Sequence, residues 1–304
     1  MLTARLFLRE KHKNLEKNSK FEPCTLKVTR MLEIPESTTI SLQASEMLAG
    51  KILSDVITAT SPHKFAWYNG DPENYPELLA GRTVSGATGH GAFVTLHFDR
   101  DTHLTVGDGT NLKYGWPEEP RPAKHQLLLE FSDGSFLYFT VAMYGAIYAY
   151  RGEFDNPYYR GSLEKISPLE VGFDRPYFDA IRAKSKPNLS TKAFLATEQR
   201  IPGLGNGTLQ DILFRSKLHP KRKISTLSER EWTVMFDTVK GTLEQMTDLG
   251  GRDTEKDFFG KYGAYRTLLS KNTWKNPCPV CGGAIVKEPY LGGAVYYCPV
   301  CQPL

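Results

Sequence analysis

The sequence lacks any apolar run long enough to cross a membrane. A bilayer-spanning helix needs about 20 consecutive apolar residues, and no stretch of the 304 residues approaches that length. The opening residues 1–8 are too short, and too soon interrupted by charge, to resemble a secretory signal. We therefore expect a cytoplasmic protein that has no membrane partner.

The sequence also lacks a strong charge of either sign. Its 38 lysines and arginines against 34 acidic residues give a formal net charge of +4, which permits a nucleic-acid partner without requiring one. The hydrophobic fraction of 40% and the aromatic fraction of 12% are ordinary for a globular protein with a real core. The length allows one large domain or two smaller ones.

Cysteine is nearly absent until the end of the chain, where four of the five cysteines fall in the last 27 residues and only Cys24 lies elsewhere. Cys278, Cys281, Cys298 and Cys301 form the pattern C-x2-C-x16-C-x2-C. Paired spacing of this kind in an intracellular chain indicates a metal site, since disulfides are rare there. Four thiolates complete a tetrahedron around Zn²⁺ and leave no position for water, so the site is predicted to hold one structural zinc. A redox dithiol is the alternative, but it explains two matched pairs less well.

The segment between the cysteine pairs predicts a small ribbon. Residues 284–286 and 295–297 have strand character on either side of Gly292 and Gly293. A segment this short has little core of its own, so metal binding is expected to supply much of its folding free energy.

The rest of the chain divides by pattern. Residues 1–30 are basic and polar, and we interpret them as a disordered or mis-assigned start, with a DNA-binding arm as the alternative. Residues 31–150 are predicted to be a β domain, mostly strand from about residue 40, and residues 151–165 a linker. Residues 166–270 have helical periodicity, and residues 271–304 are the metal finger.

Particular strands and one helix are predicted inside these regions. Residues 93–98 alternate in polarity, and residues 127–131 and 136–140 flank an Asp-Gly turn that favours a hairpin, so a sandwich or barrel is expected. The clearest helix begins at Ser228, whose hydroxyl forms a capping box with Glu231. Its apolar stripe is typical of core packing.

A glycine-rich turn, residues 201–207, leads directly into a helix. Exposed backbone N–H groups and the positive end of a helix can hold a phosphate, and Asn206 adds a side-chain donor. The alternative is that the glycines only start the helix. Basic residues follow closely and strengthen the positive field: Lys217, His219, Lys221, Arg222 and Lys223.

The order of these features resembles one family. Residues 33–36 read E-x-P-E, a β domain follows, residues 203–206 read G-x-G-N ahead of His219-Pro220, and a four-cysteine finger ends the chain. Together they resemble the formamidopyrimidine-DNA glycosylase and endonuclease VIII family from Met31 to the C-terminus. The resemblance implies an α+β multidomain fold with an N-terminal β-sandwich domain, a helix–two-turn–helix domain and a zinc-ribbon finger.

The resemblance also implies a function in base-excision DNA repair. Such a protein clamps damaged or abasic double-stranded DNA as a monomer at the bacterial nucleoid, and flips a damaged base into a pocket. Glu33 would manage protons at the sugar, and Glu36 would help to shape the catalytic site. The residues that would contact DNA are Gly205, Asn206, Gly207, Gly293 and Lys261.

The sequence departs from the family pattern where the chemistry is expected. Leu32 stands where the family has a proline whose amine attacks the sugar, so AP lyase activity is doubtful. The family's R-G-K strand motif reads His90-Gly91-Ala92, and its D-P-R-R-F-G segment reads as residues 140–145, with Tyr144 keeping an aromatic ring. Gly293 replaces the finger arginine that would grip phosphates.

Three functions remain open on the sequence. The first is an active glycosylase that removes an oxidised base, with Glu33 activating water or with the amine of Met31 as a displaced nucleophile. The second is a catalytically inactive member that binds DNA through its helix turn and finger. The third is an interaction module in which zinc and helices only maintain the fold, which the retained turn at residues 203–206 disfavours.

Overall fold

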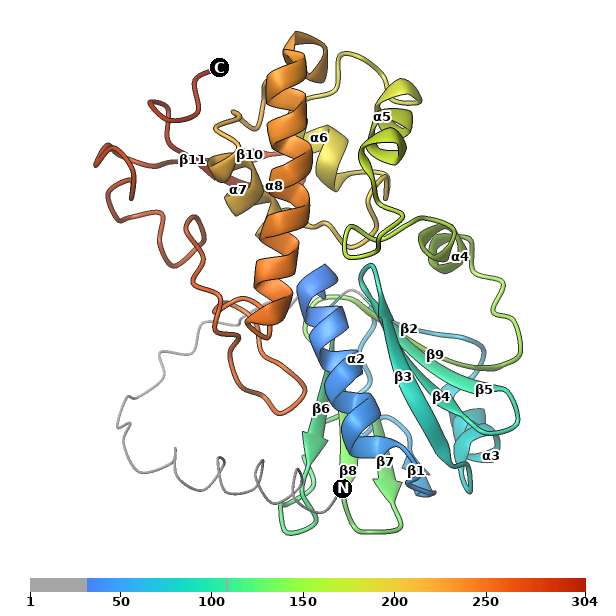
Figure 1. The fold of residues 1–304 in the computed structure, drawn as a ribbon. Helices are drawn as coiled ribbons and strands as arrows, with labels where there is room; N and C mark the ends of the chain where they lie inside the picture. The colour runs from blue at the N-terminus through green and yellow to red at the C-terminus, as the bar shows by residue number, and fades with distance from the viewer. Residues whose placement is uncertain (1–31, 108) are drawn as a thin grey trace.

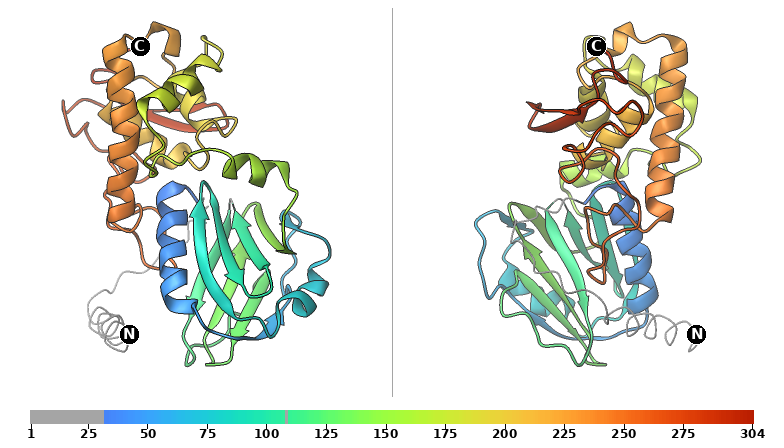
Figure 2. Two further views of the ribbon diagram at one scale, coloured as in Figure 1. Left: turned by 45° about the vertical axis from the view of Figure 1, so that its right-hand side comes forward. Right: turned by 90° about the vertical axis from the view of Figure 1, so that its left-hand side faces the viewer.

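The computed structural model describes residues 32–107 and 109–304. The predicted basic extension, residues 1–30, and Met31 lie outside these residues. The first half of the described chain forms a β domain, and the second half carries the long helix α8 (Glu229–Asp248) and the C-terminal finger (Figure 1). Helix α2 (Ile34–Leu48) lies between the sheets and the lower end of α8, as the turned views also show (Figure 2). No helix among the described residues is long and apolar enough to cross a membrane.

The β domain is a sandwich of two sheets, as predicted. The four-stranded sheet has the order β1 (Leu53–Ile57), β7 (Leu127–Phe131), β8 (Phe136–Val141), β6 (Thr110–Gly115). The five-stranded sheet has the order β2 (Ala66–Tyr68), β9 (Gly145–Arg151), β5 (Thr102–Gly107), β4 (Phe93–Phe98), β3 (Val84–His90). A 3₁₀ turn (Pro72–Asn74) and helix α3 (Tyr75–Leu79) follow β2.

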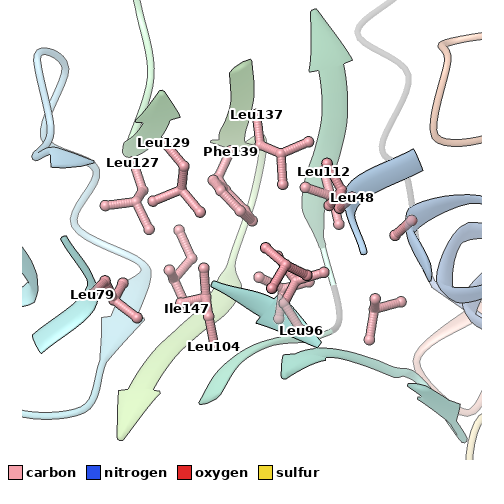
Figure 3. Close-up of a cluster of buried hydrophobic side chains, with 14 of the residues drawn as sticks. Leu48, Leu79, Leu96, Leu104, Leu112, Leu127, Leu129, Leu137, Phe139 and Ile147 are labelled. Atoms are coloured by element: carbon pink, nitrogen blue, oxygen red, sulfur yellow. The ribbon is translucent and has the colours of Figure 1, made fainter. Parts of the chain in front are cut away.

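The core of the sandwich comes from alternate residues that point inward from both sheets. The predicted β7–β8 hairpin is confirmed, with Leu129 opposite Leu137 and Leu127 opposite Phe139. Figure 3 shows these side chains facing others from the second sheet, with Leu48 and Leu79 of the flanking helices beside them. Within the hairpin turn, Gly134 takes a positive φ of 81°, which glycine adopts without steric cost.

The expectation of mostly strand from about residue 40 was wrong for residues 40–48, which belong to α2. The β-branched run at the start of this helix lowers its intrinsic propensity, so tertiary packing decides its conformation. Pro35 near its start has a φ suited to the first turn. The helix lies close against β3 because that strand has glycines at the contact. A Cβ at Gly89 would be 2.4 Å from the Ser37 carbonyl oxygen.

The second half of the chain has its own core. Helices α5 (Arg175–Ala183), α6 (Thr191–Ala196), α7 (Asn206–Arg215) and α8, with a 3₁₀ turn (Ile224–Thr226), enclose stacked aromatic rings. The Trp232 ring of α8 stacks on Phe178 at 4.6 Å between ring centroids. The predicted capping box is confirmed, because the Ser228 hydroxyl accepts from the Glu231 N–H and the Glu231 carboxylate accepts from the Ser228 N–H.

Packing crosses the predicted domain boundaries. The stretch predicted as a linker contains helix α4 (Pro157–Leu163), and Tyr159 of this helix packs edge-on against Phe93 of the β sandwich. Phe258, from the region assigned to the helical domain, is fully buried in the core of the β sandwich. The chain that follows α8 therefore ties the two parts together.

The finger contains the predicted two-stranded ribbon. Strands β10 (Val286–Tyr290) and β11 (Gly293–Tyr297) pair in antiparallel register, so the first strand begins two residues later than expected. Leu291 and Gly292 form the turn, and both have a positive φ, which matches the twist of a tight hairpin.

Candidate active site and nucleic-acid interface

Glu33 caps the helix that follows the glycine-rich turn. Its Oε1 accepts from the Gly207 N–H and its Oε2 from the Thr208 N–H, each at 2.8 Å. The carboxylate is 3% exposed and lies at the positive end of α7, where an anion is stabilised. The sequence predicted that such N–H groups would face a phosphate, but two of them are occupied by this side chain.

Arg252 connects the two carboxylates that were predicted to be catalytic. Its Nε and Nη2 donate to the Oε1 and Oε2 of Glu36 at 2.9 and 2.7 Å, and its backbone N–H donates to the same carboxylate at 3.1 Å. Its Nη1 lies 3.4 Å from the Glu33 Oε1. All three side chains are less than 5% exposed. A guanidinium is suited to this position because its planar fork binds a carboxylate through two bonds.

Glycines allow these groups to approach. A Cβ at Gly207 would lie 1.5 Å from the Arg252 Nη1, and a Cβ at Gly205 would lie 2.5 Å from the Glu33 carboxylate. Gly203 has a positive φ of 75° and contacts the backbone of Gly91, where a Cβ would come within 2.2 Å. Glycine at these positions therefore brings the turn into contact with both Glu33 and the β domain.

One face of α7 holds the finger. Asn206, Gln210 and Phe214 are four residues apart, so they share a side of the helix. The Asn206 Nδ2 donates to the Ala294 carbonyl at 2.8 Å, and the Gln210 Oε1 accepts from the Tyr296 N–H at 3.0 Å. Phe214 belongs to the apolar cluster of the finger.

Lys192 of α6 completes the contact between α7 and the finger turn. Its Nζ donates to the Asn206 Oδ1 at 2.8 Å and to the Tyr290 carbonyl at 2.6 Å. Burial lowers the pKa of Lys192 to about 8. The predicted DNA contact Gly293 lies beside this group, because a Cβ there would be 3.3 Å from the Asn206 amide nitrogen. Asn206 and Gly293 are thus brought together.

A cavity of about 180 Å³ opens at this junction. Its lining includes Glu33 and Arg252, Asn206 from α7, and Glu255 and Lys271 from the chain that follows α8. Burial raises the pKa of Glu255 to about 7, while Arg252 counteracts this rise and the carboxylates of Glu36 and Glu33 add to it. Glu255 also lines a second, smaller cavity, together with Leu32 and Glu36.

The four cysteines of the finger form a single cluster. Their sulfur atoms all lie within 4.8 Å of one another, which suits a shared metal ion. The Cys278 Sγ is 3.8 Å from that of Cys301, and the Cys281 Sγ is 3.4 Å from that of Cys298. In a tetrahedron of Zn–S bonds of about 2.3 Å, the sulfur atoms would be about 3.8 Å apart. The donor set therefore fits a metal.

Other residues predicted to contact DNA have different surroundings. Lys261 is exposed, but it lies on a turn closed by Asp257, whose carboxylate bonds Gln43 of α2, and not at the cavity. Within the predicted basic cluster, Lys221 pairs with Glu288 at 2.7 Å and Arg222 with Glu231. Two of the four lysines and arginines in this cluster are thus paired with neighbouring carboxylates.

The next residues are those at which the sequence departs from the family pattern, and each has its own contacts in the fold. The His90 Nε2 lies 2.9 Å from the Ser162 carbonyl of α4. Tyr144 packs against Trp67, which is 46% exposed, and Met143 beside it is 52% exposed. Leu32 is 8% exposed and packs into the β-domain core.

Sequence reasoning missed four residues that build the site: Lys192, Gln210, Arg252 and Glu255. Arg252 bonds a residue 216 positions away, and no local pattern reports such a contact. The sole local signal was the Gly250-Gly251 helix end directly before it, which indicates a sharp change of direction.

The fold and the site define a two-part protein in which a β sandwich, a glycine-rich helix turn and a four-cysteine finger meet around one cavity. Residues 31–149 match the family model described as the formamidopyrimidine-DNA glycosylase N-terminal domain. The chain is thus similar to the formamidopyrimidine-DNA glycosylases, and residues 31–149 match the N-terminal domain of that family.

The similarity to known proteins covers about nine-tenths of this chain. The formamidopyrimidine-DNA glycosylase of Cytobacillus firmus is 28% identical over 292 residues, covering 90% of this chain and 100% of the relative. That of Legionella pneumophila is 28% identical over 282 residues, covering 90% and 99%. The Lactococcus lactis Fpg bound to DNA with an abasic site matches with a TM-score of 0.76 at 24% identity, covering 90% of this chain and 100% of that one. The Thermus thermophilus MutM (Fpg) protein has a TM-score of 0.73, with 89% and 98% covered.

Proposed function

We propose that the protein is a DNA glycosylase of base-excision repair, which binds damaged duplex DNA and releases an oxidised base. The observation that carries this proposal is the cavity where Glu33, the start of α7 and the finger meet. The carboxylates and side-chain amides that line it are the groups that base release and phosphate binding need. Relatives that match 90% of this chain are named as formamidopyrimidine-DNA glycosylases.

Asn206 is the proposed phosphate contact. Its amide nitrogen donates one hydrogen to Ala294, and an amide has a second hydrogen available for a phosphate oxygen. The Lys192 ammonium on its oxygen fixes the orientation of the amide and adds a nearby positive charge. Gly205 and Gly207, on either side of Asn206, and Gly293, which lies beside it, are proposed as further contacts to the DNA backbone. Lys261 is proposed as an outlying contact.

We propose that the four cysteines bind one structural Zn²⁺. The metal would hold the two cysteine turns together and close a finger that has few apolar residues of its own. The side chain of Gln302 then secures the finger to the helices, since its Nε2 donates to the Leu218 carbonyl at 2.8 Å and its Oε1 accepts from the Cys298 N–H.

An inactive DNA-binding member is the second candidate, and Leu32 favours it. A buried leucine at the position of the family's nucleophilic proline offers no amine. Glu33 and Glu36 still surround the site, so hydrolytic base release without lyase chemistry stays compatible with the structure.

The deciding experiment measures base release from duplexes that carry a formamidopyrimidine, an oxidised pyrimidine or an abasic site. The full chain and a chain starting at Met31 are compared, with borohydride present to trap covalent adducts. Base release without a trapped adduct supports a hydrolytic glycosylase, and an adduct with the shorter chain alone would assign the amine of Met31. Salt-sensitive binding with no product from any duplex would leave the inactive candidate.

Asn206→Ala tests the DNA interface separately. Loss of a hydrogen bond to a charged phosphate is worth about 1.5–3 kcal/mol, which corresponds to roughly a 10- to 100-fold rise in Kd. Asn188→Ala, at an exposed position outside the cavity, serves as the matched control. A Kd for Asn206→Ala equal to that of the control would rule out this phosphate contact.

A further inference from the structure

The two carboxylates predicted to be catalytic have their oxygens occupied. Both oxygens of Glu33 accept backbone N–H groups of α7, and Oε1 also faces Arg252. Both oxygens of Glu36 accept from Arg252. Each carboxylate is therefore already engaged in holding another part of the protein. Their geometry suits a role in holding α7 and Arg252, and Glu255 is a further carboxylate at the same cavity.

Glu255 is the carboxylate that lies between the two cavities. It lines the larger one together with Glu33 and Lys271, and the smaller one together with Leu32 and Glu36. Its backbone is fixed, since its N–H donates to the Arg252 carbonyl at 3.1 Å and its carbonyl accepts from the Gly263 N–H at 3.2 Å. The backbone of Glu255 is therefore anchored where the linings of the two cavities meet.

The charges around Glu255 come from three parts of the chain. Arg252 lies beside it on the same segment, Glu33 and Glu36 face it from the N-terminal part of the described chain, and Lys271 approaches from the segment before the finger. Burial raises the pKa of Glu255 to about 7, with Arg252 and Lys271 opposing the rise. A carboxyl group with a pKa near the working pH exchanges a proton in both directions, which is the requirement for general acid–base catalysis.

We propose that Glu255 is the proton-transfer residue for base release in this protein. The proposal rests on the proposed glycosylase function. Protonated Glu255 donates its proton to the departing base as the bond between C1′ and the base nitrogen breaks and its electron pair leaves with the base. Water then forms the new bond to C1′, and its proton returns to the Glu255 carboxylate. One water is consumed, and the free base and an abasic sugar are the products.

The test is the pH dependence of base release by the full zinc-loaded chain, with Glu255→Gln, Glu255→Asp and Lys271→Met as variants. The wild-type kcat/KM is expected to fall above about pH 7, as the carboxyl group loses its proton. Glu255→Gln should lower kcat about 100-fold or more, leave KM within a few-fold and abolish that fall. Glu255→Asp should recover part of the rate. Lys271→Met should move the fall to higher pH, because Lys271 lowers the pKa of Glu255.

Glu244→Gln, at an exposed position on α8, should leave rate and profile unchanged. An active wild type whose kcat and profile survive Glu255→Gln would overturn the inference and leave the glycosylase function standing. A wild type that releases no base from any damaged duplex would overturn the glycosylase function, and with it the role of Glu255.

Discussion

Glu255→Gln should stabilise the protein at alkaline pH, even though we expect it to lower kcat about 100-fold or more. The folded protein raises the pKa of this carboxyl from 4.5 to about 7 by burial. Between these values the folded chain keeps a proton that the unfolded chain has released, so the free energy of unfolding falls as the pH rises. Above about pH 7 both states have lost the proton, and the fall is complete. A pKa change of this size corresponds to about 3 kcal/mol. Because the side chain borders a cavity, we take about 1.5–3 kcal/mol as the expected range.

Thermal unfolding of the wild type and Glu255→Gln at pH 5 and pH 8 measures this effect. Glutamine imitates the protonated carboxyl, so the variant should gain under 1 kcal/mol at about pH 5 and about 1.5–3 kcal/mol at about pH 8. At about 2–4 °C per kcal/mol, the gain at pH 8 is roughly 3–12 °C in Tm. Zinc is kept in excess in both buffers, and Glu244→Gln serves as the control. An equal Tm difference at both pH values would refute a buried, proton-holding Glu255.

Three further predictions concern the residues around the cavity and the finger. Arg252→Met should lower the free energy of unfolding in urea by about 3–5 kcal/mol, because it leaves two buried carboxylates without their partner. Arg266→Met, which changes a side chain that is 88% exposed, is the control and should lower it little. Equal losses for the two variants would contradict the role of Arg252 as the partner of Glu33 and Glu36. Asp211→Asn should lower the free energy of unfolding by about 1–3 kcal/mol and speed amide exchange at residues 268–269. The buried carboxylate accepts from both of their N–H groups, which an asparagine NH₂ cannot do. Exchange protection equal to that of the wild type would contradict this role of Asp211. Cys298→Ser should abolish stoichiometric zinc binding and loosen the finger, and a full zinc content measured by metal analysis would disprove the four-thiolate site.

The parts of the fold that sequence predicted well are those with a local physical cause. The Ser228 capping box involves residues three positions apart, and the β7–β8 hairpin depends on an Asp-Gly turn between two apolar runs. The cysteine pairs have a spacing that only a shared metal explains well. In each case the residues that interact are near one another in sequence, or their pattern repeats, so the chain itself reports the contact.

Helix α2 shows where such reasoning fails. Its residues 38–40 are β-branched, which favours strand in isolation, and the glycines that let it pack are on β3, about 45 positions further along the chain. The stability of the helix depends on that distant surface. The surroundings of Glu33 could not be predicted for the same reason. The resemblance implied a proton-handling role for this carboxylate, and no local pattern showed that its hydrogen-bond donors come from residues 207 and 208.

Contacts between residues far apart in the sequence also make Arg252, Gly207 and Glu255 depend on one another. Any side chain at Gly207 would occupy the position of the Arg252 guanidinium, since even a Cβ would lie 1.5 Å from its Nη1. Displacing Arg252 would expose Glu33 and Glu36 to each other without a cation between them, and would remove the charge that limits the rise in the pKa of Glu255. A single methyl group at residue 207 should therefore affect the stability of the domain junction and the pH at which Glu255 loses its proton. Gly207→Ala should show both effects together, whereas the same change at a glycine in the first turn of a helix with no further role would change helix stability alone.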